Sequence, residues 1–511
     1  MRESARRVAS AVGAIAVCWA LAGCVAPQNP VPEETEPEPQ ETPVPGDSFE
    51  LRRETLLEEN RSHMRLSEQE LQLEEVLTAL KADARTYCGD EGAYGIHDWS
   101  TPELGQTNLH RFLAAMPKGA DLHAHDLDFV PPDILIDTLV SLGNVLVELK
   151  DTPDGVRATF YSGSLGAPDG AVPIDEALSE GIIDRASLVD LLTVDRELPH
   201  DQAMLQLANI EAGLSGLWAD PSIAAGVAAQ GLYNYVASGV RLVELRLTLT
   251  PNDNANLERL MAIRSAYYQV RSSEPDFRLR VIACADTAGS SPDAAIETLR
   301  SAIRLSTQVL DGWDTENPQP LIIGLDLTGD EDTSASLTDL ADFLCSDEVA
   351  ASGLRLFLSC GETLSTDNAS VVDAYLMGAA RVGCALNLRR FPTLLERYRQ
   401  DGIAIETYPV STWRMGLVDD LRLHPAESYL RRQAKVVIAS DRGGLVEPCI
   451  LTDDYVAATL AWDLSLADLK QLVLDSIECS GLTSEEVGLA RARWEADWDA
   501  FVASELGQPM P

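Results

Sequence analysis

Eight short apolar runs, each followed by a stretch long enough for a helix, dominate the chain from about residue 109 onward. Such runs are typical of strands that are buried on both faces, as in parallel sheets. They span Ala120–His125, Leu242–Leu247, Leu279–Cys284, Leu321–Leu327, Leu354–Cys360, Arg381–Leu386, Ile403–Thr407 and Val436–Asp441. This alternation predicts an α/β fold of the TIM-type (β/α)8 barrel class. The rival is a doubly wound open sheet, but no Gly-rich phosphate loop follows the first run.

Two segments do not follow this alternation. Residues 49–85 are rich in Glu, Leu and Arg and contain no Gly or Pro, which predicts amphipathic helices within an N-terminal helical segment, residues 49–108. Helices of this kind pack on the domain or form a dimer contact, so a homodimer through them is one predicted arrangement. Residues 143–200 begin with a Gly- and Pro-spaced β-like stretch, which predicts an insertion after the first strand, near the mouth of a barrel that spans residues 109–505.

The first residues resemble an export signal. Three arginines precede the apolar run Val8–Ala20, which is too short to span a membrane. Leu21-Ala22-Gly23-Cys24 resembles a bacterial lipoprotein signal, so we expect a signal peptide at residues 1–23 and a lipid on Cys24; the alternative is an ordinary cleaved signal peptide. Residues 24–48 are rich in Pro and Glu, as expected of an extended tether. The protein is therefore predicted to be exported and lipid-anchored to the cell membrane, with its domain outside the cytoplasm.

The charge of the chain limits its partners. With 81 acidic and 39 basic residues, the formal net charge is −42. Such a chain repels phosphate backbones and anionic headgroups, so nucleic acid is excluded as a partner and the lipid is the only expected membrane contact. Cys284, Cys360 and Cys384 lie in apolar runs and are expected to be small buried residues rather than a disulfide framework.

Polar side chains stand where the predicted strands end, which is where barrel enzymes place their active sites. His123 and His125 close the first strand, and alternate residues of a strand point the same way, so both imidazoles can face one metal ion. Asp441 closes the eighth strand and completes a ligand set that suits zinc. Glu362 follows the fifth strand, either as a general acid/base or as a carboxylate at a helix N-terminus.

These residues lie in segments that resemble the adenosine deaminase family of metal-dependent hydrolases. Met116 to Gly119 followed by Leu122-His123-Ala124-His125-Asp126 resembles the family's first-strand motif, in the form found in the secreted branch, the adenosine-deaminase-related growth factors. The resemblance continues in order through Gly324–Asp332, Gly361–Thr363, Ile405–Ser411, Leu417–Pro425, Leu451–Tyr455, Asp468–Leu472, Asp475–Glu478 and Arg493–Phe501.

The resemblance implies a barrel in which zinc activates a water for the hydrolytic deamination of adenosine to inosine. His123, His125 and Asp441 match zinc ligands of the family, and Glu362 matches the glutamate that shuttles a proton to the ring. Gly329 matches a backbone position that contacts the purine. The implied cofactor is therefore Zn2+, and the implied partner is a small-molecule purine nucleoside or a related substrate.

Three departures from the family pattern fall on the chemistry itself. Ser359 stands where the family has its third histidine ligand, and Cys384 stands where it has the histidine that orients the attacking water. Arg442 replaces an aspartate that the family uses on the purine. Cys384 is either a substitute zinc ligand or a small apolar filler. Loss of the water-orienting base alone removes typically ~10²–10⁴ in rate, which predicts impaired or redirected activity.

Two functions remain open at this point. The first is a zinc-dependent aminohydrolase with weak or redirected activity, in which Arg442 would favour an anionic substrate. The second is a pseudoenzyme, a catalytically inactive nucleoside-binding or cell-surface interaction protein that uses the barrel mouth as a pocket.

Lipidation is testable on its own. In a bacterial host that processes lipoproteins, the full chain should incorporate labelled palmitate and sediment with membranes. Cys24→Ser should abolish both because it removes the predicted acceptor sulfur, whereas Cys18→Ser, inside the signal run, should leave both unchanged. Equal labelling of Cys24→Ser and the parent chain would contradict the assignment.

Overall fold

The fold is known from a computed structural model that describes residues 49–58, 64–87, 102–153, 155–308, 320–446 and 450–507. The described residues belong to two units, which divide the chain between Glu59 and Asn60. The first unit has one described helix, α1 (Phe49–Glu58). The predicted signal peptide, tether and lipidation site at Cys24 lie outside the described residues, and none of the described helices is long and apolar enough to cross a bilayer.

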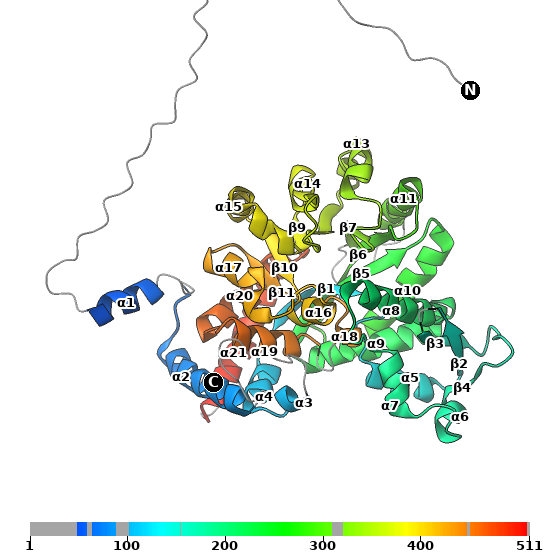
Figure 1. The fold of residues 1–511 in the computed structure, drawn as a ribbon, viewed down its shortest axis with the longest axis horizontal. Coiled ribbons are helices and arrows are strands. Elements are labelled where there is room, and N and C mark those ends of the chain that lie inside the picture. The colour runs from blue at the N-terminus through cyan, green and yellow to red at the C-terminus, as the bar shows by residue number, and fades with distance from the viewer. Residues whose placement is uncertain are drawn as a thin grey trace, which may run out of the picture. The chain divides into compact units, whose positions relative to one another are not determined.

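The second unit is built on an eight-stranded parallel sheet (Figure 1). Its strands, in spatial order, are β1 (Gly119–His125), β5 (Val240–Leu249), β6 (Arg278–Asp286), β7 (Ile322–Thr328), β8 (Arg355–Cys360), β9 (Arg381–Cys384), β10 (Ala404–Thr407) and β11 (Val436–Ile438). The first and last strands approach through a parallel bridge between Ala124 and Asp441, and the His125 N–H donates to the Asp441 carbonyl at 3.2 Å. The predicted barrel is confirmed, and the open-sheet alternative is wrong, because each predicted run overlaps one strand of this nearly closed sheet.

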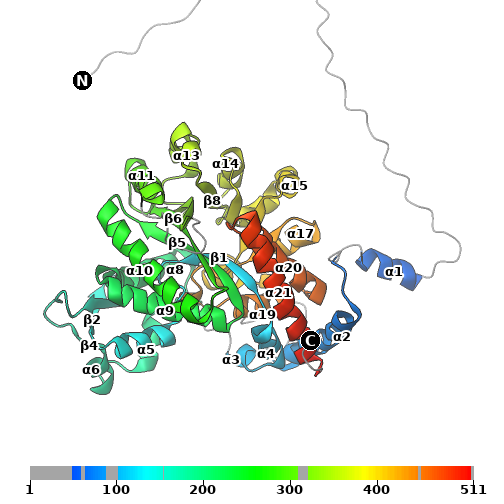
Figure 2. The ribbon, with the colours of Figure 1, turned by 180° about the vertical axis from the view of Figure 1, so that it is seen from behind.

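Helices cover the outside of the sheet, as seen from both sides in Figures 1 and 2. The helices that follow successive strands are α9 (Pro221–Ala237), α10 (Asp253–Ser273), α11 (Pro292–Gln308), α13 (Asp347–Ser352), α14 (Ser370–Leu376), α15 (Pro392–Asp401), α17 (Pro425–Arg431) and α20 (Leu466–Glu478). With side chains on one face inside the barrel and helices against the other, every residue of β1 is buried. This explains why the strands appear in the sequence as continuous apolar runs.

Local sequence signals set several helix ends. α20 begins with a capping box between Ser465 and Asp468, and α21 (Ser484–Glu505) begins with one between Thr483 and Glu486. α15 ends at Gly402, whose φ of 71° is the left-handed conformation that glycine adopts without a steric penalty.

The predicted insertion after the first strand is present. α5 (Pro132–Leu142) leads into a small antiparallel sheet of β2 (Val145–Thr152), β3 (Gly155–Ser162) and β4 (Val172–Pro173), followed by α6 (Ile174–Ser179), α7 (Arg185–Leu191) and α8 (His200–Leu214). α8 and the turn after it pack directly on β3, since a Cβ at Gly213 would lie 2.2 Å from the Ala158 carbonyl oxygen. The Val194 N–H donates to the Leu445 carbonyl at 3.0 Å, which brings the end of the insertion to α18 (Gly443–Val446), the short helix after β11.

One predicted N-terminal helix packs on the domain. α2 (Glu68–Tyr87) buries Leu73 and Leu77, and its Lys81 ammonium donates to the Leu464 carbonyl at 2.9 Å. The helices α3 (Pro102–Gly105) and α4 (Asn108–Ala115) then lead to β1. For α2, packing on the domain is therefore the observed alternative; a homodimer through the N-terminal helices stays a prediction.

Buried ion pairs cross the inside of the barrel. The Arg246 guanidinium on β5 donates to Asp326 on β7 and to Glu406 on β10, each at 2.7 Å. Arg381 on β9 donates to Glu406 as well and to Glu244 on β5. β5 and β10 are not neighbours in the sheet, so these contacts pass through the interior and join strands from different parts of the barrel wall.

Arg246→Met should unfold the protein more easily. The substitution removes the Arg246 guanidinium from Glu406 and Asp326, which stay buried. Breaking a buried ion pair in this way typically lowers the free energy of unfolding by about 3–5 kcal/mol. Urea denaturation of the variant and the parent chain measures this difference. Arg300→Met, which breaks the exposed pair with Glu348, is the matched control and should cost about 1 kcal/mol or less. Equal effects of the two substitutions would contradict a structural role for the buried network.

Candidate metal centre and its cavity

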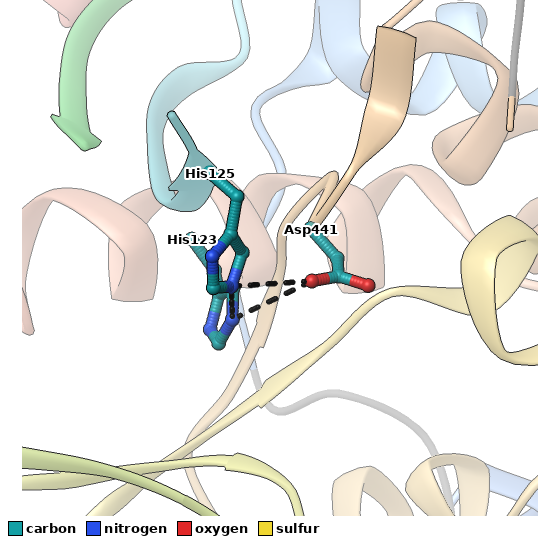
Figure 3. A group of neighbouring side chains, drawn as sticks. All are labelled: His123, His125 and Asp441. Carbon is teal, nitrogen blue, oxygen red and sulfur yellow. Dashed lines mark hydrogen bonds and ion pairs between the residues drawn. The ribbon is translucent and has the colours of Figure 1, made fainter. Parts of the chain in front are cut away.

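Three potential metal ligands meet at the C-terminal edge of the barrel (Figure 3). The Nε2 atoms of His123 and His125 lie 3.0 Å apart. Asp441 Oδ1 lies 3.7 Å from the first nitrogen and 3.4 Å from the second. All three residues are buried. The two histidines point the same way, as expected of alternate residues on a strand, and the ends of the first and eighth strands meet.

The protonation states of these side chains fit a zinc site. His123 Nδ1 lies 2.6 Å from the Glu406 carboxylate. Burial raises the pKa of Glu406, but Arg246 and Arg381 outweigh it and hold that pKa well below its ordinary value, so the carboxylate accepts and Nδ1 carries the proton. The lone pair of His123 Nε2 is then free to face His125, as in carboxylate–histidine–zinc arrangements.

The other two ligands are also prepared as donors. Burial, and after it the charges of Arg442 and His123, lowers the pKa of His125 well below its ordinary value, so its imidazole is neutral at neutral pH. The Ser411 hydroxyl donates to Asp441 Oδ2 at 2.7 Å, which leaves Oδ1 directed at the two histidines. Two imidazole nitrogens and one carboxylate oxygen match the donors that zinc takes in catalytic sites.

A cavity of about 570 Å³ opens over these ligands. The predicted site residues that line it are His123, His125, Gly329, Ser359, Glu362, Cys384, Asp441 and Arg442. The fold thus brings every predicted catalytic, substrate-binding and metal-binding position to one hollow. Their chemical roles stay predictions.

Ser359 adjoins His123 but directs its hydroxyl elsewhere. A Cβ on Gly383 would lie 2.8 Å from the His123 ring and 3.3 Å from Ser359 Oγ, which places both side chains around one point. The Ser359 hydroxyl donates to Asp326 Oδ2 at 2.9 Å, and its N–H donates to Asp326 Oδ1 at 2.8 Å. The serine therefore completes the buried polar network, and a neutral hydroxyl is a weak metal ligand.

Glu362 has the acidity expected of a proton donor. Burial, followed by the charges of Glu331 and Asp441, raises the pKa of Glu362 to about 8, so the carboxyl is protonated at neutral pH. Its loop is held by Glu331, whose carboxylate accepts from the N–H groups of Gly361 and Glu362, both at 2.8 Å. Glu331 lies in the segment Gly324–Asp332 that resembles the family, but no sequence signal predicted its contact with the Glu362 loop.

Cys384 ends β9 in a left-handed conformation, with φ of 65°. Burial, and after it the charge of Glu362, raises the pKa of the Cys384 thiol well above its usual range, so it is neutral. Cys384 does not belong to the group of donor atoms within 4.8 Å of one another, which consists of His123, His125 and Asp441 among the described residues. These observations favour the filler interpretation of Cys384 over a substitute ligand.

Arg442 is surrounded by acidic side chains from three segments of the chain: α8, the turn after β1 and the end of the segment after β11. Its guanidinium donates to Glu211 on α8 at 2.9 Å and to Asp441 at 3.3 Å, and lies 3.8 Å from Asp128. The charge that was expected to attract an anionic substrate is therefore already balanced by the protein. Gly329 has φ of 128°, and a Cβ there would lie 2.7 Å from Ser334 Oγ, so only glycine fits this position of the wall.

Sequence reasoning missed two further residues of the site. Glu406 is the carboxylate partner of His123, and Tyr408 lines the cavity with its ring centroid 4.9 Å from that of His123. Both belong to a segment that resembled the family, but only the folded chain shows what they contact.

A parallel barrel that carries a His-x-His pair and an aspartate at the C-terminal ends of its first and last strands has the architecture of the metal-dependent hydrolases. Within that class, the adenosine deaminase family model matches residues 229–489. The chain belongs to the adenosine deaminase family, as its sequence motifs predicted.

Curated relatives are similar to this chain in sequence, and solved structures share its fold. Adenosine deaminase 2 of Dictyostelium discoideum is 26% identical over 427 residues, 78% of this chain and 75% of that protein. Adenosine deaminase 2-A of Danio rerio is 27% identical over 428 residues, 79% of this chain and 83% of that protein. A zinc-bound cog1816 amidohydrolase from Burkhoderia ambifaria shares the fold with a TM-score of 0.52 at 16% identity, covering 82% of this chain and 97% of that one.

Glu406→Gln should weaken zinc binding. The amide can donate to His123 Nδ1 and so place the proton on Nε2, and loss of such a partner typically lowers metal affinity about 10–100-fold. Competition with a fluorescent chelator measures the zinc affinity of the folded variant. Glu211→Gln, which alters the mouth without touching a histidine, is the control and should bind zinc like the parent chain. Unchanged affinity in Glu406→Gln would show that the carboxylate does not set the histidine tautomer.

Proposed function

We propose that this protein is a zinc-binding member of the adenosine deaminase family that holds a purine nucleoside or related ligand at the barrel mouth and deaminates adenosine poorly. The observation that carries the proposal is the convergence of His123, His125 and Asp441 in a cavity that also contains Ser359 and Cys384 at the two positions where the family pattern has histidines.

The retained residues support hydrolytic chemistry. Zinc, held by His123, His125 and Asp441, would supply a bound water with a pKa near neutrality. Glu362 carries a proton at neutral pH and lines the same cavity, so it is suited to protonate a ring nitrogen of the ligand. Glu331 keeps the backbone of Glu362 in place.

The replaced residues explain why turnover should be low. Cys384 is a neutral thiol and cannot act as the base that orients a water, which typically removes about 10²–10⁴ in rate. Ser359 contributes a hydroxyl that donates to Asp326 instead of an imidazole. The guanidinium of Arg442 presents a cation where the family pattern places a second carboxylate.

The location of the protein is part of the proposal. The signal-like residues 1–23, Cys24 and the Pro- and Glu-rich segment 24–48 support export and attachment to the cell membrane through a lipid, with the domain outside the cytoplasm. The predicted homodimer through the N-terminal helices is a separate expectation that size measurement of the purified chain would decide.

Metal content and turnover test the proposal together. The purified full chain should bind close to one zinc ion per molecule, and ammonia release from adenosine should stay at least ~100-fold below that of an intact family member, because the orienting base is missing. Absence of zinc after incubation with excess metal would contradict the metal site, and rapid release of ammonia would contradict the impairment.

Restoring the family residues should restore turnover. The triple variant Ser359→His, Cys384→His and Arg442→Asp supplies the third ligand, the orienting base and the second carboxylate, so adenosine deamination should rise at least ~100-fold. Ser359→Ala combined with Cys384→Ala and Arg442→Ala is the control, which changes the same positions without adding these groups. If the variant with Ser359→His, Cys384→His and Arg442→Asp folds and binds zinc but remains inactive, other positions limit the chemistry.

A further inference from the structure

A second hollow of about 690 Å³ adjoins the cavity over the metal ligands. The two hollows share His125, Gly329 and Arg442 in their walls, so they form one mouth with two parts. We call the second part the acidic lobe, because six acidic side chains line it: Asp126, Asp128, Asp201, Glu211, Asp286 and Asp330. α8, which carries Asp201 and Glu211, forms one wall.

The cations of the acidic lobe do not balance these carboxylates. Among the residues that line it, Arg259 and Arg442 are the only Arg or Lys side chains. Arg442 is paired with Glu211 and Asp441, and Asp128 lies close to it. Arg259 donates to the Thr248 carbonyl at 2.5 Å and lies over the Trp218 ring, 5.4 Å from its centroid.

Other carboxylates of the lobe are held by neutral donors. Asp286 accepts from the Ala288 N–H at 2.8 Å, and Asp126 accepts from the Thr248 N–H at 3.1 Å. Burial is the largest cause that raises the pKa of Asp286, and the charge of Glu211 acts in the same direction. A concave surface on which acidic side chains outnumber basic ones concentrates a negative field, and the net charge of −42 adds to it.

The lobe also offers apolar contact. Leu205, Leu214 and Trp218 lie in its wall beside the carboxylates. An aliphatic arm could pack on these side chains while a cation at its end meets the acids. A phosphate would instead face the acidic side chains of the lobe and find both guanidinium groups engaged.

We propose that the acidic lobe selects a purine-type ligand whose far end carries a positive charge, such as a primary amine on a short aliphatic arm, and rejects the corresponding phosphate. The proposal rests on the proposed function, in which the purine part lies over the zinc ligands. It names the substrate class toward which the altered site is redirected and reverses the expectation of an anionic substrate that Arg442 alone had suggested.

Three ligands with the same purine and ribose test this selection. Calorimetric titration of the zinc-loaded full chain with 5′-amino-5′-deoxyadenosine, adenosine and adenosine 5′-monophosphate compares a cationic, a neutral and an anionic end. The amine should bind about tenfold more tightly than adenosine, and the monophosphate about tenfold more weakly, because one charge–carboxylate contact is gained or opposed. The preference should shrink as salt is added.

A matched pair of variants locates the effect. Asp201→Asn with Asp286→Asn removes two carboxylates of the lobe and should erase most of the preference for the amine while leaving the affinity for adenosine within about twofold, since neither residue lines the cavity over the metal ligands. Asp169→Asn with Asp175→Asn removes two exposed carboxylates of the insertion and should leave the preference intact.

The outcomes separate the two proposals. Equal affinities for the three ligands, tightest binding of the monophosphate, or an amine preference that survives Asp201→Asn with Asp286→Asn would overturn the role of the lobe and leave nucleoside binding standing. Binding of none of the three by the zinc-loaded chain would overturn the proposed function, and the role of the lobe with it.

Discussion

The contact between His123 and Glu406 is the interaction on which the site depends. Glu406 stays ionised inside the barrel because Arg246 and Arg381 surround it, and its charge in turn holds the proton on His123 Nδ1, the ring nitrogen that faces it. The same carboxylate therefore helps to join β5, β9 and β10 and prepares a metal ligand. Removing these charged side chains from water costs free energy, and the buried network is stable only while each charged group keeps its partner.

The replacements at the mouth are accommodated by that network and by α8. Ser359 takes its place beneath the histidines by donating to Asp326, which also receives Arg246. Arg442 is accepted because Glu211, from the insertion after β1, reaches across to it. Ser359 and Arg442 thus both find hydrogen-bond partners within the protein. Under this condition catalytic residues can be replaced while the fold is kept.

The electrostatic character of the mouth follows from elements that are far apart along the chain. Glu211 comes from α8, Asp286 from β6 and Asp330 from the loop after β7, and the fold brings them to one hollow. Arg442, considered alone, suggested an anionic ligand. The acidic side chains around it decide the sign of the electrostatic field in the cavity. Charge selectivity is a property of the assembled cavity and cannot be assigned residue by residue.

The sequence alone determined the barrel, the insertion and the convergence of His123, His125 and Asp441, because strand burial and a two-residue side-chain period are local properties that follow from residue order. Its resemblance to the adenosine deaminase family identified Ser359, Cys384 and Arg442 as departures. Only the tertiary structure decided the partners: Glu406 for His123, Asp326 for Ser359, Glu331 for the Glu362 loop and Glu211 for Arg442. Each of these contacts joins residues that are remote in sequence, so their geometry exists only after the strands have assembled.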